Sequence, residues 1–261
     1  MDTLQAVLLG IVQGITEFLP VSSSGHLQLA KELLGVELDN NITFDVTLHA
    51  ATVLSTVVVL WRELWRLFCG LFSRTWNEEH AFVAKILLSM IPAGVVGLCF
   101  ADRIEALCSS LAFVGCMLLA TAALLAFAYY ARPRPKTSIS YRDAFVIGLA
   151  QAAATLPGLS RSGSTIATGL LLGNEKGAVA NFSFLMVIPV ILGKMLLDIA
   201  SGEMAALDVP AAALAGGFFA AFVTGTLACR FMIGIVKRGR LIWFALYCLA
   251  AGLVALAGAF S

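Results

Sequence analysis

A serine-rich run at residues 22–26 holds residue types that could bind a phosphate group. It consists of Ser22, Ser23, Ser24, Gly25 and His26. Hydroxyls and free backbone N–H groups directly before a helix favour anion binding, because a helix N-terminus presents unsatisfied donors and a positive dipole. An imidazole titrates near neutral pH, so His26 is a candidate acid, base or nucleophile, and Ser23 is the rival nucleophile.

Two polar residues precede this run inside an apolar stretch. Gln13 and Glu17 lie four residues apart and therefore share one face of a predicted helix. An ionisable side chain at membrane depth is costly, so Glu17 is a candidate for a functional site. The alternative is that Glu17 is neutral, or lies near the membrane interface and caps a neighbouring helix.

A second polar run, at residues 157–165, adds a fixed positive charge. It contains Pro157, Gly158, Ser160, Arg161, Ser162, Gly163, Ser164 and Thr165, and a helix is predicted from about 164 to 172. The guanidinium group of arginine matches phosphate oxygens in bidentate fashion. Together the two runs favour a phosphate or diphosphate ligand. The alternative for Arg161 is a structural ion pair with Glu17.

A carboxylate beside a diphosphate predicts a divalent cation between them. Mg²⁺ or Ca²⁺ binds carboxylate and phosphate oxygens together and neutralises the charge of the transferred group. Asp45 and His49 stand four residues apart at the start of another apolar stretch. They line the mouth of the same site or lie at the membrane interface, and the sequence leaves both readings open.

The elements that position these residues are predicted to be membrane helices. The chain of 261 residues is 60% apolar and 13% charged, which excludes an ordinary soluble enzyme, and its net charge of +1 excludes nucleic acid as a partner. Six stretches are long and apolar enough to cross a membrane. They are residues 43–61, 82–100, 111–130, 179–198, 209–230 and 241–260.

Two further apolar stretches, 4–34 and 144–173, contain the polar runs and are predicted as re-entrant helical hairpins. Each would consist of two short helices around a polar turn, because non-helical backbone at membrane depth must be satisfied by protein or by a water-filled cavity. The alternative is a pair of kinked ordinary spans.

The chain also shows an internal repeat. A shift of 138 residues aligns segment 10–44 with segment 148–182, with matches that include Gly10 with Gly148, Gln13 with Gln151 and Ser22 with Ser160. The predicted repeats are residues 1–137 and 138–261, each one hairpin plus three spans. Three is odd, so the second repeat is predicted to be inverted, with the two polar turns meeting near the membrane midplane.

The distribution of basic residues orients the chain. With six spans and two hairpins, most lysines and arginines fall on one face, among them those of the loop from Arg62 to Arg74, and only Lys31, Arg103 and Lys194 fall on the other. The positive-inside rule makes the first face cytoplasmic. His80 is predicted to lie in a solvated cytoplasmic loop.

At these motifs the sequence resembles the undecaprenyl-diphosphate phosphatases of the bacterial plasma membrane, also known as bacitracin-resistance proteins. The resemblance covers nearly the whole chain. The first motif is carried by Gln13, Glu17, Ser22, Ser23, Ser24, Gly25 and His26. The second motif, PGxSRSxxT, is carried by Pro157, Gly158, Ser160, Arg161, Ser162 and Thr165.

The resemblance implies hydrolysis of a polyprenyl diphosphate to the monophosphate, which recycles the lipid carrier for peptidoglycan synthesis and confers bacitracin resistance. It implies a multi-pass protein of the inner membrane, dependence on Mg²⁺ or Ca²⁺, and an active site open to the periplasmic side. Catalytic roles fall on Glu17, Ser23, His26 and Arg161. Gln13 stands where the family has Glu or Gln, so Gln13 and Glu17 are the expected metal ligands.

The runner-up function is a polyprenyl-phosphate flippase or transporter, because inverted repeats with broken helices around a midplane site are typical of transporters. A pure carrier needs the anion-binding groups but no nucleophile or proton donor. The sequence leaves open the choice between Ser23 and His26 as nucleophile, the native ion, the preferred chain length and the presence of a homodimer.

Overall fold

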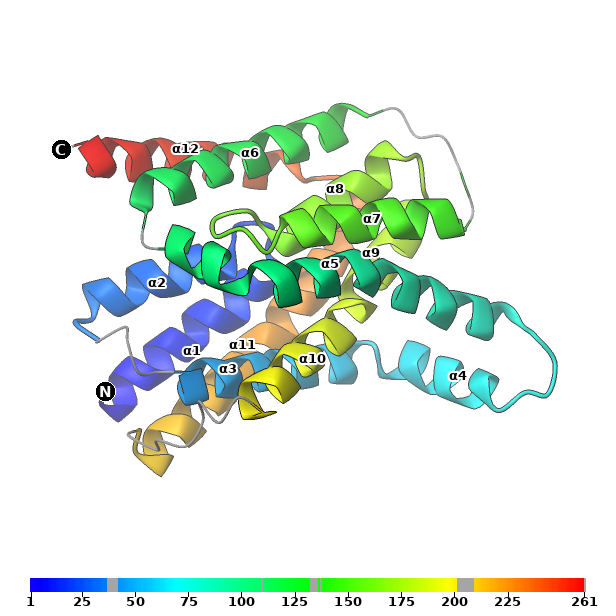
Figure 1. Cartoon of the computed structure of the whole chain (residues 1–261), viewed down its shortest axis with the longest axis horizontal. Helices are drawn as coiled ribbons and strands as arrows, with labels where there is room; N and C mark the ends of the chain where they lie inside the picture. The colour runs from blue at the N-terminus through cyan, green and yellow to red at the C-terminus, as the bar shows by residue number, and fades with distance from the viewer. Residues whose placement is uncertain (37–41, 109, 132–135, 137, 201–208, 261) are drawn as a thin grey trace.

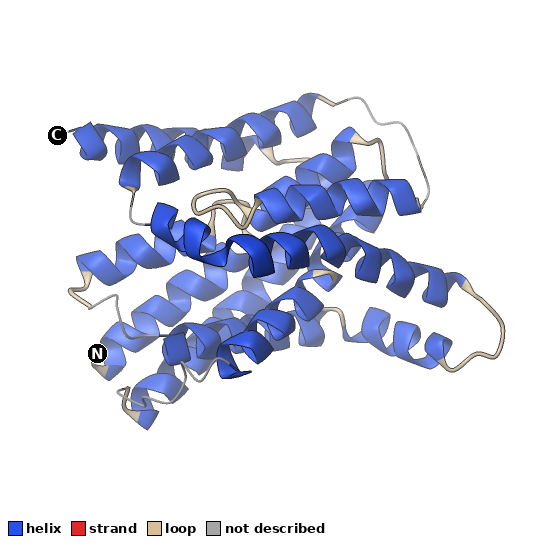
Figure 2. Cartoon of the chain, viewed as in Figure 1, coloured by secondary structure: helices blue, strands red, loops and turns tan. Residues whose placement is uncertain are grey.

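The computed structural model of the protein describes residues 1–36, 42–108, 110–131, 136, 138–200 and 209–260 (Figure 1). The regular secondary structure of these residues is all α-helix, joined by turns and loops (Figure 2), and their one β-type pairing is an isolated bridge between Lys136 and Asn174. The helices are α1 (Thr3–Phe18), α2 (Ser23–Leu33), α3 (Ile42–Val59), α4 (Trp61–Leu71), α5 (Glu78–Cys108), α6 (Leu111–Tyr130), α7 (Tyr141–Ala153), α8 (Arg161–Leu171), α9 (Lys176–Leu185), α10 (Val187–Ala200), α11 (Ala211–Arg238) and α12 (Ile242–Phe260).

Five helical segments among the described residues are long and apolar enough to cross a membrane, and a sixth is obtained if α3 and α4 count as one bent span. The predicted spans correspond to α3, α5, α6, the pair α9–α10, α11 and α12. The protein is therefore an all-helical, multi-pass membrane protein, as its apolar composition predicts.

Each predicted hairpin consists of two short helices around a turn, but most of each polar run lies in the second helix of its pair, since α2 begins at Ser23 and α8 begins at Arg161. In the first, α1 and α2 pack together and flank the turn at residues 19–22, and in the second α7 and α8 flank the turn at 154–160. Helix α8 begins at Arg161, three residues earlier than the sequence predicts, because the Ser160 hydroxyl caps it by accepting from the Gly163 N–H at 3.1 Å. Arg161 is thus the first residue of the helix and not part of the turn.

The predicted span 179–198 corresponds to a candidate membrane span, Lys176–Leu197, whose helix is interrupted at Met186 between α9 and α10. Pro189, the third residue of α10, has no N–H to donate to the carbonyl of Leu185, so a continuous helix would leave that carbonyl unsatisfied. The prediction that His80 lies in a loop is wrong, because His80 is in the first turn of α5. Its backbone N–H donates to Asn77 Oδ1 at 2.8 Å.

The predicted cytoplasmic loop from Arg62 to Arg74 is also wrong for most of its length, because residues 61–71 form α4, which is bent by 80° from α3. One side of α4 carries exposed aromatic residues, with stacked rings of Trp61 and Trp65 and an extension through Phe68. The segment is too short and too rich in charge to be recognised as a span, which explains why hydropathy alone missed it.

A short connection anchors the second hairpin. The Lys136 N–H donates to Gly173 O at 3.2 Å, the Glu175 N–H donates to Lys136 O at 3.1 Å, and the Lys136 ammonium pairs with Asp143 at 3.0 Å. Glu175 caps α9, where its carboxylate accepts hydrogen bonds from two backbone N–H groups. These hydrogen bonds lower the pKa of Glu175 below its usual value. The predicted repeat boundary falls at residue 137, which lies outside the described residues.

The two halves of the chain are interleaved. Helix α1 packs along α11, α7 packs along α5, and α6 lies beside α12 (Figure 1). The first of these contacts is very close at Gly14, where an added Cβ would lie 2.5 Å from the Ala221 carbonyl oxygen and 2.7 Å from the Gly225 nitrogen. The hairpin that carries Glu17 is therefore held by backbone-to-backbone packing against the second half.

We expect Gly14→Ala to destabilise the protein by about 1–3 kcal/mol, because the new methyl group meets backbone atoms of α11 that cannot move aside. The measurement is the temperature at which half of the detergent-purified protein loses its monodisperse peak. Gly94→Ala is the matched control, since a Cβ at Gly94 would have no heavy atom within 4 Å. Equal midpoints for the two variants would contradict the close α1–α11 contact.

Candidate active site

The site is built around Glu17, which lies at the end of α1 and is 6% exposed. Its Oε2 accepts two hydrogen bonds, from Gln13 Nε2 at 3.0 Å and from Ser23 Oγ at 2.7 Å. Gln13 is one helical turn earlier, on the face that the sequence predicts, and Ser23 is the first residue of α2. A carboxylate thus contacts a hydroxyl that could serve as a nucleophile.

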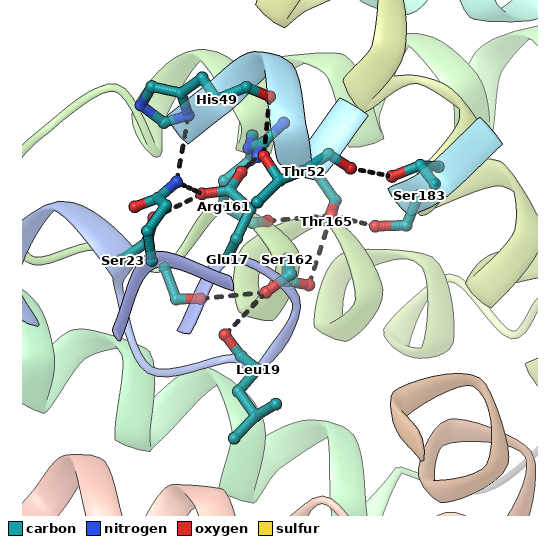
Figure 3. Close-up of polar contacts among 12 residues, drawn as sticks. Glu17, Leu19, Ser23, His49, Thr52, Arg161, Ser162, Thr165 and Ser183 are labelled. Atoms are coloured by element: carbon teal, nitrogen blue, oxygen red, sulfur yellow. Dashed lines mark hydrogen bonds and ion pairs between the residues drawn. The ribbon is translucent and has the colours of Figure 1, made fainter. Parts of the chain in front are cut away.

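Arg161 joins the second hairpin to this group. Its Nη2 forms an ion pair with Glu17 Oε1, so the two hairpins meet at these side chains (Figure 3). The alternative reading of Arg161, an ion pair with Glu17, is therefore present in the structure. The second terminal nitrogen, Nη1, is buried and has no hydrogen-bond partner among the described residues. A buried guanidinium N–H without a partner is costly, which marks this point as able to receive an acceptor oxygen.

His49, which the sequence left open, belongs to the same cluster. Gln13 must direct its NH₂ group toward Glu17, because a carboxylate only accepts, and the same nitrogen lies 3.2 Å from His49 Nδ1. His49 Nδ1 is therefore the acceptor in this contact. Asp45 lies one turn earlier and pairs instead with the buried Lys31 at 2.7 Å, away from the Glu17 cluster.

His26 has different partners from the other predicted catalytic residues. Its Nδ1 lies 2.9 Å from Ser22 O, and its Nε2 lies 2.6 Å from the Tyr247 hydroxyl on α12. Within the residues that the structure describes, these contacts direct the ring toward α12 and not toward Glu17. The structure thus brings Glu17, Ser23 and Arg161 together, with His26 beside them on the same first turn of α2.

The predicted hydroxyl groups mostly bond to the protein itself. Ser162 Oγ donates to Leu19 O at 3.2 Å, and Thr165 Oγ1 contacts Ser183 Oγ at 2.5 Å. The hydroxyls of Ser22 and Ser24 lie 3.4 Å apart, and those of Ser160 and Ser162 lie 3.3 Å apart. Gly25 is buried against Ser22 and Val114, with room for an added Cβ at 3.5 Å. These contacts brace the two turns against one another.

Two polar residues that the sequence analysis named without an individual role are buried. Gln151, the repeat counterpart of Gln13, and Ser164 each have a side chain without a hydrogen-bond partner among the described residues. The predicted span 241–260 includes Tyr247 and gives it no role. A tyrosine hydroxyl within such a span nevertheless indicates that a polar partner is needed.

A groove opens beside the site, between α1 and α12, with a volume of about 300 Å³. Its lining is mainly apolar because the one hydroxyl of the α1 wall, at Thr16, donates to Val12 O at 2.7 Å. The groove is lined by Ile15, Thr16, Leu19, Val21, Trp243, Phe244 and Tyr247. Thr16, which lines the groove, directly precedes Glu17 in α1, so the groove runs beside the helix that carries the carboxylate.

The donor set fits a cation only if a ligand supplies most of the oxygens. No group of three or more His, Cys, Asp or Glu side chains suited to a metal is found in the described parts of the chain. Mg²⁺ is commonly held by one or two carboxylates together with substrate phosphates, and Glu17 with the Gln13 amide meets this minimal requirement. The unpartnered Arg161 Nη1 beside them is suited to the same phosphate oxygens.

The chain is similar over nearly its whole length to one family of known proteins. The family profile described as "Bacitracin resistance protein BacA" matches residues 6–254. The chain belongs to the BacA family. Among BacA relatives, a protein of Parabacteroides distasonis named undecaprenyl-diphosphatase is 60% identical over 261 residues and covers 98% of both chains.

Two other BacA relatives carry the same name. The protein of Bacteroides fragilis is 57% identical and covers 97% of both chains. The protein of Christiangramia forsetii is 51% identical and covers 100% of both chains. The match therefore includes both hairpins and every helix that carries a site residue.

Proposed function

We propose that the protein hydrolyses undecaprenyl diphosphate to undecaprenyl phosphate and inorganic phosphate. This activity recycles the lipid carrier for peptidoglycan synthesis and confers resistance to bacitracin. The observation that carries the proposal is the buried cluster in which Arg161, at the start of α8, meets Glu17 and Ser23 from the other hairpin. The names of the whole-length relatives support the same activity.

Diphosphate binding uses Arg161 and the N-termini of α2 and α8. Both helices begin at the site, and their first N–H groups and positive dipole ends favour an anion. Arg161 exchanges its contact with Glu17 for phosphate oxygens, and its free Nη1 adds a second donor. The polyprenyl tail extends along the apolar groove between α1 and α12, so the substrate arrives sideways from the lipid.

The geometry supports Ser23 as the nucleophile. Its Oγ donates to Glu17 Oε2 at 2.7 Å, so Glu17 is placed to take the hydroxyl proton. Ser23 Oγ then bonds to the terminal phosphorus, and the bond from that phosphorus to the bridging oxygen breaks, releasing undecaprenyl phosphate. Water hydrolyses the phosphoserine to inorganic phosphate, with His26 as the base for that water once Nε2 exchanges its contact with the Tyr247 hydroxyl for it.

We also propose that Gln13 and Glu17 hold Mg²⁺ or Ca²⁺ shared with the diphosphate. The ion would neutralise the charge of the phosphate oxygens. A Gln13→Glu variant adds a second carboxylate one turn from Glu17, and we expect the half-activating concentration of Mg²⁺ or Ca²⁺ to fall. The measurement is phosphate release against metal concentration after chelator treatment. An unchanged half-activating concentration would argue against these two ligands.

We propose a location in the bacterial plasma membrane, with the site open to the periplasmic side and the two repeats inverted. The packing of α1 on α11 and of α7 on α5 supports the repeats, because these are equivalent pairs under the 138-residue shift. The excess of basic residues on one face supports the orientation. Reporter fusions after Arg74 and after Arg240 should both report the cytoplasm, and a periplasmic signal from either would overturn this topology.

Phosphate release by the purified protein from undecaprenyl diphosphate tests the function directly. We expect stoichiometric inorganic phosphate and undecaprenyl phosphate, together with a phosphorylated Ser23 when the reaction is quenched early. Tight lipid binding without phosphate release would instead favour the carrier function, which the names of the relatives do not support. A phosphorylated His26 would reassign the nucleophile and leave the reaction intact.

A further inference from the structure

Helix α12 contacts the first hairpin through polar atoms of two consecutive residues, Tyr247 and Cys248. The Tyr247 hydroxyl lies 2.6 Å from His26 Nε2, and the two rings are stacked with centroids 5.6 Å apart at 23°. The next residue, Cys248, donates its S–H to Pro20 O at 3.3 Å. Tyr247 is 47% exposed on a helix that is otherwise apolar, so its hydroxyl would face lipid without this partner.

The contacts of His26 fix which ring nitrogen carries the proton. Ser22 O lies 2.9 Å from Nδ1, and because a carbonyl only accepts, Nδ1 must be the protonated nitrogen. In the neutral ring Nε2 is then the acceptor, and it receives the Tyr247 O–H. The Ser22 carbonyl is held in this direction by an uncommon backbone conformation, with φ at 71° in a residue other than glycine.

Tyr247 also forms part of the wall of the apolar groove. The groove is lined by Trp243, Phe244 and Tyr247 on one side and by α1 with Leu19 and Val21 on the other. The ring of Tyr247 therefore contacts the groove while its hydroxyl bonds to the imidazole at the N-terminus of α2. One side chain touches both the expected path of the tail and the expected base.

We infer that Tyr247 is a positioning residue for His26. Its hydroxyl holds His26 in the Nδ1–H tautomer with Nε2 directed toward α12, and its ring, which lines the groove, links the position of that base to the isoprenoid chain. The inference rests on the proposed diphosphatase function. It assigns to α12, which carries neither sequence motif, a part in the hydrolysis that the motifs alone do not indicate.

The kinetic experiment compares Tyr247→Phe with Trp243→Ala, on a long polyprenyl diphosphate and on a short, water-soluble isoprenoid diphosphate. Loss of the hydroxyl should lower kcat on the order of 10- to 100-fold for both substrates with little change in KM. Trp243→Ala, which alters only the groove, should raise KM for the long substrate alone. Tyr130→Phe, at the exposed end of α6, is the matched control and should keep wild-type kinetics.

The second readout is the ¹⁵N spectrum of protein labelled at histidine, of which the chain has only 3. The His26 signals are assigned by their loss in His26→Asn. The wild type should show a protonated Nδ1 and a hydrogen-bonded acceptor Nε2, and Tyr247→Phe should shift the Nε2 signal. Unchanged His26 signals, or wild-type kcat in Tyr247→Phe, would overturn the inference. If wild-type protein releases no phosphate, the proposed function fails instead, while the spectrum still tests the Tyr247 contact.

Discussion

Arg161→Ala is expected to reduce phosphate release on the order of 10³–10⁴-fold, because the variant loses the guanidinium that binds the diphosphate in a site shielded from water and leaves Glu17 without its partner. Diphosphate binding needs both the charge and the two terminal nitrogens of the guanidinium. One nitrogen of Arg161 contacts Glu17, and the other has no partner among the described residues. Arg161→Lys keeps the charge but not the bidentate geometry, so it should recover only part of the activity. The measurement is phosphate release from undecaprenyl diphosphate at saturating metal.

The same substitution should destabilise the protein by about 3–5 kcal/mol, because it leaves the buried Glu17 carboxylate without its partner. A double variant, Arg161→Ala with Glu17→Gln, removes both charges and should recover much of that stability while remaining inactive. This combination separates a folding defect from a catalytic one. Near wild-type activity in Arg161→Ala would refute the role of Arg161 in diphosphate binding.

Glu17→Gln is expected to be the second most damaging substitution, with kcat lower on the order of 10²–10⁴-fold. The amide keeps the size of the side chain but cannot take a proton from Ser23, whose hydroxyl is 2.7 Å from the carboxylate. It also lacks the negative charge that a divalent cation requires. The measurement is single-turnover phosphate release, followed over a wide range of Mg²⁺ concentration.

Glu32→Gln is the matched control for that variant, because Glu32 is an exposed carboxylate on the neighbouring helix α2. It should behave as the wild type. If Glu17→Gln regains full activity when Mg²⁺ is raised, Glu17 serves the metal alone and another group must activate Ser23. Unaltered activity at all metal concentrations would remove Glu17 from the mechanism.

Much of the architecture could be predicted because a membrane imposes length and polarity on each element. Spans such as 111–130 follow from hydropathy, and the hairpins follow from polar turns that a continuous span would not tolerate. Helix α4 was not predictable in the same way, since it is short and carries Arg62 and Arg66 within an aromatic segment. The break at Met186 depends on one proline, which hydropathy does not register.

The charged residues of the site could be predicted, because an unpaired charge in an apolar segment is costly. The contacts between residues far apart in the sequence could not be predicted. Glu17 and Arg161 are charged residues within apolar segments, where an unpaired charge is costly, and they form an ion pair. The direction of His26 depends on Tyr247, which lies 221 residues away along the chain. The internal bonding of Ser162 and Thr165 likewise depends on Leu19 and Ser183, and spacing within a motif does not reveal such partners.

The close packing of α1 against α11 has a consequence for biogenesis. When the first hairpin leaves the ribosome, the partner of Glu17 and the surface that receives Gly14 have not yet been synthesised, because Arg161 and Ala221 come much later in the chain. The contacts of Glu17 with Arg161 and of Gly14 with α11 can therefore form only after the second half of the chain has been synthesised.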